Sequence, residues 1–116
     1  MIIGVGVDNM ELGRFERAAK SQRFLAKCFT DTELDLARRK GRGELNFLAG
    51  NFAAKEAIVK AIGTGFRFWP RDIEVLRDGL GRPVCYYDVG GRLHVSISHS
   101  RENVVAIAII ESVNEV

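Results

Sequence analysis

Three ionisable side chains on two separate segments form the most informative pattern in this sequence of 116 residues. Asp8 ends the segment IIGVGVD, whereas Glu56 and Lys60 lie one helical turn apart within FAAKEAIVKAIGTG. Two carboxylates on different elements could share a Mg²⁺ ion, because this ion takes few protein carboxylates and keeps water and phosphate oxygens as its other ligands. A nearby lysine could neutralise a further phosphate oxygen. Such a set suits phosphoryl transfer, which needs charge stabilisation and alignment, although the spacing alone does not show that Asp8 meets Glu56.

Two weaker candidates lie further along the chain. The turn Gly63-Thr64-Gly65 could expose several backbone N–H groups to phosphate oxygens, but a match of this length also suits an ordinary turn. His99 ends a stretch of alternating residues, and a lone histidine at the end of a strand commonly has only a structural role. The two histidines and two cysteines of the chain do not have the spacing of a zinc site.

Positively charged residues recur every three or four positions in the region 10–29, which predicts a basic stripe on one or two short helices. The stripe consists of Arg14, Arg17, Lys20, Arg23 and Lys27. Such a stripe is either a solvated helix face or a docking surface for an acidic protein or for phosphate groups. Both interpretations remain open at this point.

The element that must position Glu56 and Lys60 is a long helix, predicted over residues 44–62 and terminated by Gly63. This helix is apolar almost all round, so we expect it to be mostly buried, together with Glu56 and Lys60. Buried charges need partners or a metal, and the small residues beside these two side chains leave room for a ligand. The alternative is an ordinary ion pair between residues one turn apart.

Strands are predicted at both ends of the chain. In residues 2–8, the aliphatic side chains face one way, whereas two glycines and Asp8 face the other. Bare backbone on one face of a strand often marks the close approach of another backbone or of a ligand. Further strands are predicted over 72–77, 83–88, 94–99 and 103–110. The last of these, NVVAIAII, is apolar on both faces and therefore needs cover on both, which a partner subunit could supply.

Composition suits one domain spanning residues 1–116. The net charge of +2 is too small to indicate a nucleic-acid-binding protein by itself. The cysteines, Cys28 and Cys85, lie in apolar surroundings and are best interpreted as free thiols in a reducing cytosol. We find no signal peptide and no stretch approaching the roughly twenty apolar residues of a membrane span, so we expect a cytoplasmic protein without membrane or nucleic-acid partners.

Three motifs give the chain a resemblance to a known family. They are Gly4-Val5-Gly6-Val7-Asp8 with Glu11 and Arg14 behind it, the stretch Phe47–Gly65, and Val95-Ser96-Ile97-Ser98-His99-Ser100. They occur in family order over nearly the whole chain, which resembles the small bacterial 4′-phosphopantetheinyl transferases of the holo-(acyl-carrier-protein) synthase family. The resemblance implies an α+β fold, with one long buried helix packed on a mostly antiparallel sheet, and assembly as a trimer with active sites between subunits.

The same resemblance implies an activity. Family members move phosphopantetheine from coenzyme A to a serine of acyl carrier protein, release 3′,5′-ADP and serve fatty acid biosynthesis. Asp8 and Glu56 fall on the family's metal-binding carboxylates, which hold Mg²⁺. Lys60 falls on the lysine near the pyrophosphate, and His99 on a histidine of the coenzyme A site.

The resemblance also implies a binding partner for the basic stripe. Arg14 falls on an arginine that pairs with the acidic helix of the carrier protein, and Arg17, Lys20 and Arg23 would extend that dock. One position departs from the family pattern, because Asn51 stands where relatives usually show arginine. If that arginine holds phosphate charge of coenzyme A, another cation must replace it here; the candidates in the sequence are Lys40, Arg42 and Lys55.

Two other functions use the same residues differently. A non-catalytic module that binds RNA or acidic proteins would explain the basic stripe but not a buried Glu56 and Lys60, and it lacks the interleaved aromatic residues of many RNA-binding surfaces. A Mg²⁺-dependent nucleotide hydrolase would use Asp8, Glu56 and Lys60 but would leave the carrier dock unexplained.

Overall fold

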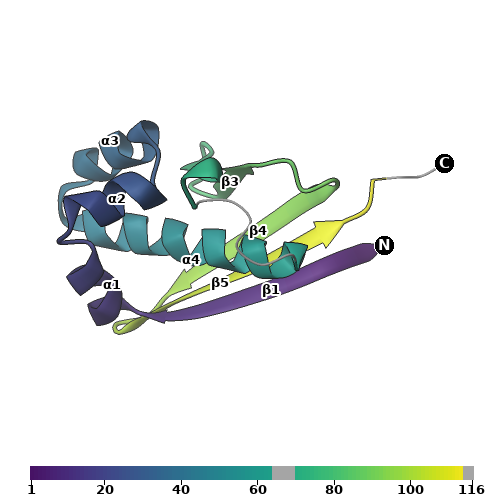
Figure 1. The fold of residues 1–116 in the computed structure, drawn as a ribbon, viewed down its shortest axis with the longest axis horizontal. Helices are drawn as coiled ribbons and strands as arrows, with labels where there is room; N and C mark the ends of the chain where they lie inside the picture. Colours follow the sequence, from purple (N-terminus) through teal and green to yellow (C-terminus); the bar gives the residue numbers. More distant parts are fainter. Residues whose placement is uncertain (64–69, 114–116) are drawn as a thin grey trace.

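The long helix α4 (Glu44–Ile62) is the central element of the computed structural model, which describes residues 1–63 and 70–113 (Figure 1). Its observed bounds are the predicted ones. The helix ends at Gly63, which has a φ of +81° and donates its N–H to the carbonyl of Val59. A left-handed residue of this kind is tolerated best when it is glycine. Most of α4 is buried, as predicted. Within the described part of the chain, no helix is both long enough and apolar enough to cross a membrane.

A three-stranded antiparallel sheet lies against α4 (Figure 1). It contains β1 (Ile2–Glu11), β5 (Asn103–Glu111) and β4 (Arg92–His99), in that spatial order. The strands from the two ends of the sequence are therefore neighbours. The face toward α4 carries small and aliphatic side chains, and the buried positions of β5 alternate along it as Val104, Ala106, Ala108 and Ile110. The prediction of one long buried helix on an antiparallel sheet is confirmed.

Two glycines of β1 allow the strand to run directly against the backbone of α4. A Cβ atom added at Gly4 would overlap the carbonyl oxygen of Ala61, and one added at Gly6 would overlap that of Ala57. The predicted alternation is therefore correct, and its bare face is filled by a helix backbone. Because side chains alternate along a strand, Asp8 also faces α4. This close approach sets the distance between Asp8 and the charged residues of the helix.

Three short helices cover the N-terminal half of α4. They are α1 (Leu12–Ala18), α2 (Gln22–Cys28) and α3 (Asp31–Arg39). Their shared core is a cluster of phenylalanine rings with centroids 5.6–6.4 Å apart, formed by Phe15, Phe24, Phe29 and Phe52. At the start of α3, Thr30 and Glu33 form a capping box, in which each side chain accepts a hydrogen bond from the backbone N–H of the other residue.

A small two-stranded sheet completes the described fold. It consists of β2 (Glu74–Arg77) and β3 (Pro83–Tyr86). Two short 3₁₀ turns are also present: η1 (Gly41–Gly43) precedes α4, and η2 (Pro70–Asp72) precedes β2. Both strands are shorter than predicted. β2 begins only at Glu74, because residues 70–72 form a 3₁₀ turn before it. β3 ends at Tyr86, because this residue pairs with Glu74, the first residue of β2.

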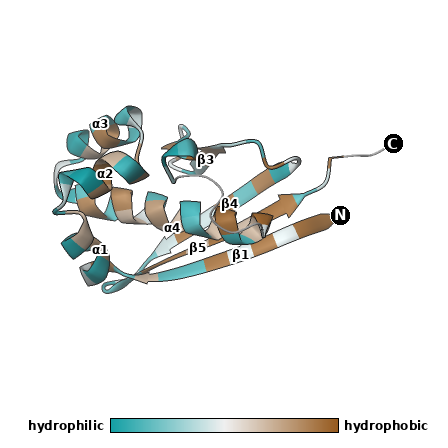
Figure 2. Cartoon of the chain, viewed as in Figure 1, coloured by the Kyte–Doolittle hydropathy of each residue, from teal (hydrophilic) through white to brown (hydrophobic). Residues whose placement is uncertain are grey.

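The face of the large sheet that points away from α4 is apolar and exposed. Ile3, Val5 and Val7 of β1 are each more than half exposed, and Val105 and Ile107 of β5 are also exposed. The pairing places Val7 directly opposite Ile107, so these side chains form one continuous patch, and Figure 2 shows the hydrophobic residues along the N-terminal half of β1. We call the five residues the outer apolar face. We predicted that β5 needs cover on both faces; in the structure α4 covers one face, and the other face is exposed.

The two cysteines are free thiols, as predicted. Cys28 is buried and Cys85 is half-buried. Burial raises the pKa of each thiol to about 11. At neutral pH both are therefore protonated, which makes them poor nucleophiles.

Candidate active site

Asp8 and Lys60 meet where β1 crosses the last turns of α4. The Lys60 Nζ atom lies 3.3 Å from Asp8 Oδ1 and donates a hydrogen bond of 3.0 Å to the carbonyl oxygen of Val7. The Asp8 side chain is only 16% exposed, whereas that of Lys60 is 55% exposed. The prediction that Lys60 is buried is wrong, because its long side chain leaves the packed face of the helix and reaches past Asp8 to solvent.

Glu56 lies one turn before Lys60 on the same helix and is half-buried. Burial raises the pKa of the Glu56 carboxyl, the negative charge of Asp8 raises it further, and Lys60 opposes both effects. The two carboxylates therefore lie close enough to repel each other. Lys60 forms its ion pair with Asp8, so the ordinary one-turn pair with Glu56 is not the arrangement that the structure has.

Both carboxylates open into one pocket of about 410 Å³ beside α1. Asp8, Glu56 and Arg14 belong to its polar part, and the phenylalanines Phe24 and Phe52 belong to its apolar wall. The pocket thus joins two repelling carboxylates to an arginine of the basic stripe. Such a place suits a cation bound by the carboxylates, with an anionic group bound to the cation and to Lys60.

The donor set decides which kind of metal site this could be. Within residues 1–63 and 70–113, no group of three or more His, Cys, Asp and Glu side chains is placed to hold a metal ion. Asp8 and Glu56 supply two carboxylates at most. That number fits Mg²⁺, which binds through one or two carboxylates and takes its remaining oxygens from water and substrate phosphate.

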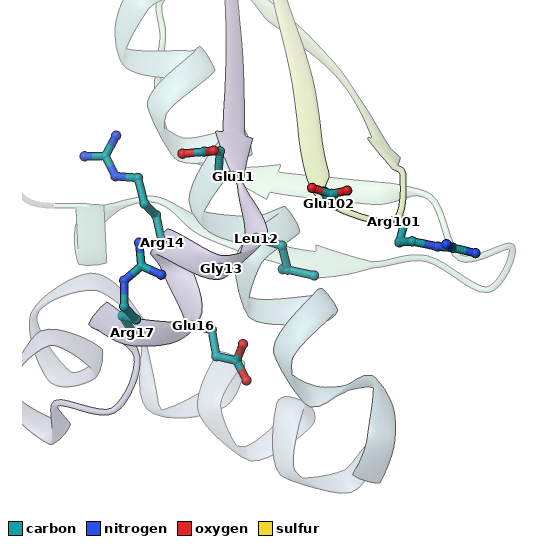
Figure 3. A pocket seen from close by; sticks show the side chains of 8 residues that line it. All are labelled: Glu11, Leu12, Gly13, Arg14, Glu16, Arg17, Arg101 and Glu102. Atoms are coloured by element: carbon teal, nitrogen blue, oxygen red, sulfur yellow. The ribbon is translucent and has the colours of Figure 1, made fainter.

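Arg14 and Arg17 project from the same side of α1, as Figure 3 shows. They contribute to a second pocket of about 350 Å³ at the start of this helix, next to the β4–β5 turn. Arg101, on that turn, points away from them (Figure 3). The other basic residues proposed for the dock, Lys20 and Arg23, are exposed as well. We call Arg14, Arg17, Lys20 and Arg23 the basic surface.

His99 is not brought to the pocket that contains Asp8 and Glu56. It lies on β4, two strands away from β1, and its imidazole packs on Gly50 of α4, where an added Cβ atom would lie 3.2 Å from Nε2. Burial lowers the pKa of His99, and the charge of Arg77 lowers it further. Of the predicted phosphate-binding turn, Gly63 ends α4, while Thr64 and Gly65 lie outside the described residues.

A buried polar network under α3 was missed by the sequence analysis. Glu33, Asn51 and Lys55 are fully buried. Lys55 donates hydrogen bonds of 2.7 Å to Glu33 Oε1 and 2.6 Å to the carbonyl oxygen of Cys28. The suggestion that Lys55 replaces a phosphate-binding arginine is therefore wrong, since this ammonium points into the core. The signal available in the sequence was the pair Asn51 and Lys55, one turn apart on a mostly apolar helix.

Asn51 holds an arginine in place. Its amide nitrogen donates to Glu33 Oε2 at 3.0 Å and to the carbonyl oxygen of Val75 at 2.9 Å. Its oxygen accepts a hydrogen bond of 2.9 Å from Arg77 Nη1. At the position where the family pattern has arginine, this chain thus has an asparagine that orients a guanidinium from β2.

Comparisons with known proteins give one consistent result. The family model described as the 4′-phosphopantetheinyl transferase superfamily matches residues 4–110. A holo-(acyl-carrier-protein) synthase of Clostridium beijerinckii is 47% identical over 97% of this chain and 100% of the relative. One from an Exiguobacterium species is 46% identical over 96% of this chain and 93% of the relative.

Solved structures agree with these sequence relatives. A synthase from Bacillus anthracis in complex with coenzyme A (3′,5′-ADP) superposes with a TM-score of 0.88, at 41% identity over 97% of this chain and 98% of the other. A synthase from Neisseria meningitidis also gives a TM-score of 0.88, at 34% identity over 97% of this chain and 100% of the other. Both structural matches extend over nearly the whole chain.

Proposed function

This chain belongs to the 4′-phosphopantetheinyl transferase superfamily, and we propose that it transfers the phosphopantetheine group of coenzyme A to a serine of apo acyl carrier protein. The other product is 3′,5′-ADP. The proposal includes Mg²⁺ dependence, a place in fatty acid biosynthesis and a cytoplasmic location, where coenzyme A and the carrier meet. Its support is the name of the relatives and the coenzyme A bound in a structural neighbour.

The observation that carries the proposal is that Asp8 and Glu56 line one pocket with Arg14, while Lys60 forms an ion pair with Asp8. A phosphoryl-transfer site needs groups that hold a divalent cation, a cation near the leaving phosphate and a way to position the acceptor. The carboxylates, Lys60 and Arg14 would meet these needs in turn. A binding module would gain nothing from two carboxylates that repel each other across a pocket.

The carboxylates would hold Mg²⁺ against the pyrophosphate of coenzyme A. When bound, this ion would supply charge neutralisation on the phosphate oxygens. Lys60 would add positive charge next to the leaving 3′,5′-ADP, and because it is more than half exposed it can turn from Asp8 toward the substrate. The half-buried pocket strengthens these electrostatic interactions by excluding part of the water.

In the transfer step, the serine oxygen of the carrier bonds to the β-phosphorus as the bond from that phosphorus to the oxygen of 3′,5′-ADP breaks. The serine proton must pass to a base. The carboxylate of Glu56 is within the pocket to accept it, and burial together with the charge of Asp8 raises the pKa of this group.

The basic surface would dock the acyl carrier protein. Its four cations are exposed, and Arg14 and Arg17 project together from α1 (Figure 3). Arg14 also lines the pocket that contains Asp8. An acidic partner bound there would bring its serine to the mouth of that pocket. Charge complementarity of this kind increases the rate of encounter and fixes the orientation of the partner.

The outer apolar face would be covered by copies of the same chain in a trimer. Five exposed aliphatic side chains in one patch are unusual for a surface that remains in water. Assembly would also bring His99 of one copy to the pocket of another, which would explain why a single chain keeps them apart. The coenzyme A site would then be shared between subunits.

The deciding experiment is the intact mass of an apo acyl carrier protein after incubation with this protein, coenzyme A and Mg²⁺. A mass gain of one phosphopantetheine group that EDTA abolishes is the expected result. A carrier whose acceptor serine is replaced by alanine serves as the control. If several apo carriers keep their mass with folded protein and Mg²⁺ present, the basic surface belongs to a non-catalytic module instead.

A further inference from the structure

The side chain of Lys55, on α4, reaches the C-terminal end of the short helix α2. Its Nζ atom donates a hydrogen bond of 2.6 Å to the carbonyl oxygen of Cys28, which is the last residue of α2. The last four carbonyls of an α-helix have no partner within the helix, so they need donors from elsewhere. A cation is a favourable donor, because the helix dipole concentrates negative charge at this end. Lys55 is therefore a cap that α4 supplies to α2.

A buried network holds this cap in one geometry. The ammonium of Lys55 is fully buried, donates at 2.7 Å to Glu33 Oε1 and lies 4.8 Å from the centre of the Phe29 ring. Glu33 is held in turn by three further donors, which are Thr30 N, Asn51 Nδ2 and Val75 N. Every buried side-chain nitrogen and oxygen in residues 1–63 and 70–113 has a hydrogen-bond partner. A fully satisfied network of this kind makes the surrounding core rigid.

Stability alone does not account for a buried pair of Lys55 and Glu33. Taking two charges out of water is costly, and two apolar side chains of similar volume often give an equally stable or a more stable fold. The pair adds direction, because a hydrogen bond to one carbonyl oxygen fixes where the end of α2 lies. This helix needs such support, since seven residues are too few for an α-helix to be stable without tertiary contacts.

The position of α2 matters for the side of the candidate site that would receive the carrier protein. Arg23 of the basic surface lies on this helix, and Lys20 precedes it by two positions. Phe24, also on α2, lines the pocket that contains Asp8 and Glu56. These two carboxylates are themselves on β1 and α4. A shift of α2 would therefore move part of the basic surface while leaving the groups for the nucleotide in place.

We propose that Lys55 is a positioning residue for the carrier protein, which sets the place of the basic surface relative to the pocket of Asp8 by capping α2. The inference rests on the proposed function and makes it more specific. Lys55 directly precedes Glu56, and the two side chains leave α4 about 100° apart. Neighbouring residues of one helix would thus serve the two substrates: Glu56 the nucleotide, and Lys55 the carrier.

The test compares the two substrates in Lys55→Met, which keeps an apolar side chain of similar length and removes the donor. Steady-state kinetics should give a KM for acyl carrier protein that is higher on the order of tenfold. Titration calorimetry with Mg²⁺ should give an unchanged affinity for 3′,5′-ADP. In the free protein, amide hydrogen exchange should become faster in residues 22–28, while α4 keeps its protection.

Two control variants separate this role from a general loss of stability. Glu33→Gln breaks the ion pair but leaves the hydrogen bond from Lys55 to Cys28, so it should lower the melting temperature and keep the KM for the carrier. Ile110→Ala removes a buried side chain opposite Gly4, on the sheet and not on α2, and should have the same outcome. The double variant Glu33→Gln/Lys55→Met leaves no unpaired charge in the core and should show the same rise in KM as Lys55→Met.

Several results would overturn the positioning role even if the protein transfers phosphopantetheine. They are an unchanged KM for the carrier in both Lys55 variants, equal losses for carrier and nucleotide, and unchanged exchange in α2. Failure of both variants to fold would overturn it too, since Lys55 would then serve the whole core. A wild type that modifies no carrier would overturn the proposed function and the role in carrier binding together, and the exchange experiment would show separately whether Lys55 caps α2.

Discussion

The carboxylate of Asp8, on the first strand, raises the pKa of Glu56, in the middle of the sequence. The two residues come together because Gly4 and Gly6 bring the backbone of β1 against that of α4. A folded protein that places two carboxylates beside each other in a half-buried pocket gives up stability at that point. Such a cost is expected at a functional site, and it can be measured.

Glu56→Gln should raise the melting temperature of the free protein while abolishing transfer. Because folding raises the pKa of Glu56, its protonated form favours the fold: this stability is present below the ordinary pKa of glutamate and is lost as the pH rises through the raised pKa. Glutamine stays neutral, so the gain should be largest at neutral pH and disappear in acid. The gain should be small, since solvent screens a half-buried group.

Differential scanning calorimetry in EDTA at several pH values measures this difference. Adding Mg²⁺ should then raise the melting temperature of the wild type but not that of Glu56→Gln, because only the wild type offers both carboxylates. A variant that melts lower than the wild type at neutral pH, or that keeps wild-type transfer rates, would contradict the assignment of this pair.

Arg14→Glu should raise the KM for the carrier protein on the order of tenfold or more, with little change in the KM for coenzyme A. The arginine belongs to the basic surface and also lines the pocket of Asp8, so reversing its charge repels an acidic partner. Steady-state kinetics with each substrate varied separately measures the two constants. Arg101→Glu is the control, because this side chain points away from Arg14 (Figure 3); an equal effect of both reversals would show that only net charge matters.

Gly6→Ala should destabilise the fold by about 1–3 kcal/mol, because overpacking forces a shift of the backbone. Its methyl group would overlap the carbonyl oxygen of Ala57, and the strand would have to move away from α4. Activity should fall as well, since the distance from Asp8 to Glu56 grows. Chemical denaturation measures the stability, and Gly79→Ala is the control, as no atom lies within 4 Å of its added Cβ. Equal stability of the two variants would contradict the close approach.

Val7→Lys should dissociate the assembly. Val7 lies in the outer apolar face opposite Ile107, and a lysine ammonium cannot be buried there without a partner. Sedimentation velocity should show the monomer for this variant and a larger species for the wild type. Tyr86→Lys is the control, because Tyr86 is as exposed as Val7 but lies on β3, outside this face. A wild type that sediments as a monomer would remove the trimer from the proposal.

The sequence sufficed for the parts of the fold that local rules determine. The bounds of α4, the capping box at Thr30 and Glu33, and the two faces of β1 follow from periodicity and capping chemistry, and the structure has all of them. The juxtaposition of Asp8 with Glu56 did not follow from these rules. It depends on a contact between elements about fifty positions apart, which only the family resemblance suggested.

The predictions from sequence that were wrong concern the burial of two long, charged side chains. Lys55 and Lys60 share one helix, yet the first is fully buried and the second is mostly exposed. Their environments depend on what packs against each face: α3 brings Glu33 to Lys55, and β1 leaves the end of Lys60 in water. Periodicity indicates which face of the helix a lysine occupies. It does not indicate whether another element places a buried hydrogen-bond acceptor next to that lysine.

The pairing of β1 with β5 also determines when this protein can fold. The hydrogen-bonded neighbour of the first strand is the last strand, and the backbone N–H of Ser112 donates to the carbonyl oxygen of Met1. A chain emerging from the ribosome therefore carries β1, with its aliphatic side chains, without its neighbour until β5 has been made. Such long-range closure slows folding and leaves an unpaired strand edge during synthesis. Chaperone access to the nascent chain should matter more here than in a protein whose first hairpin closes on itself.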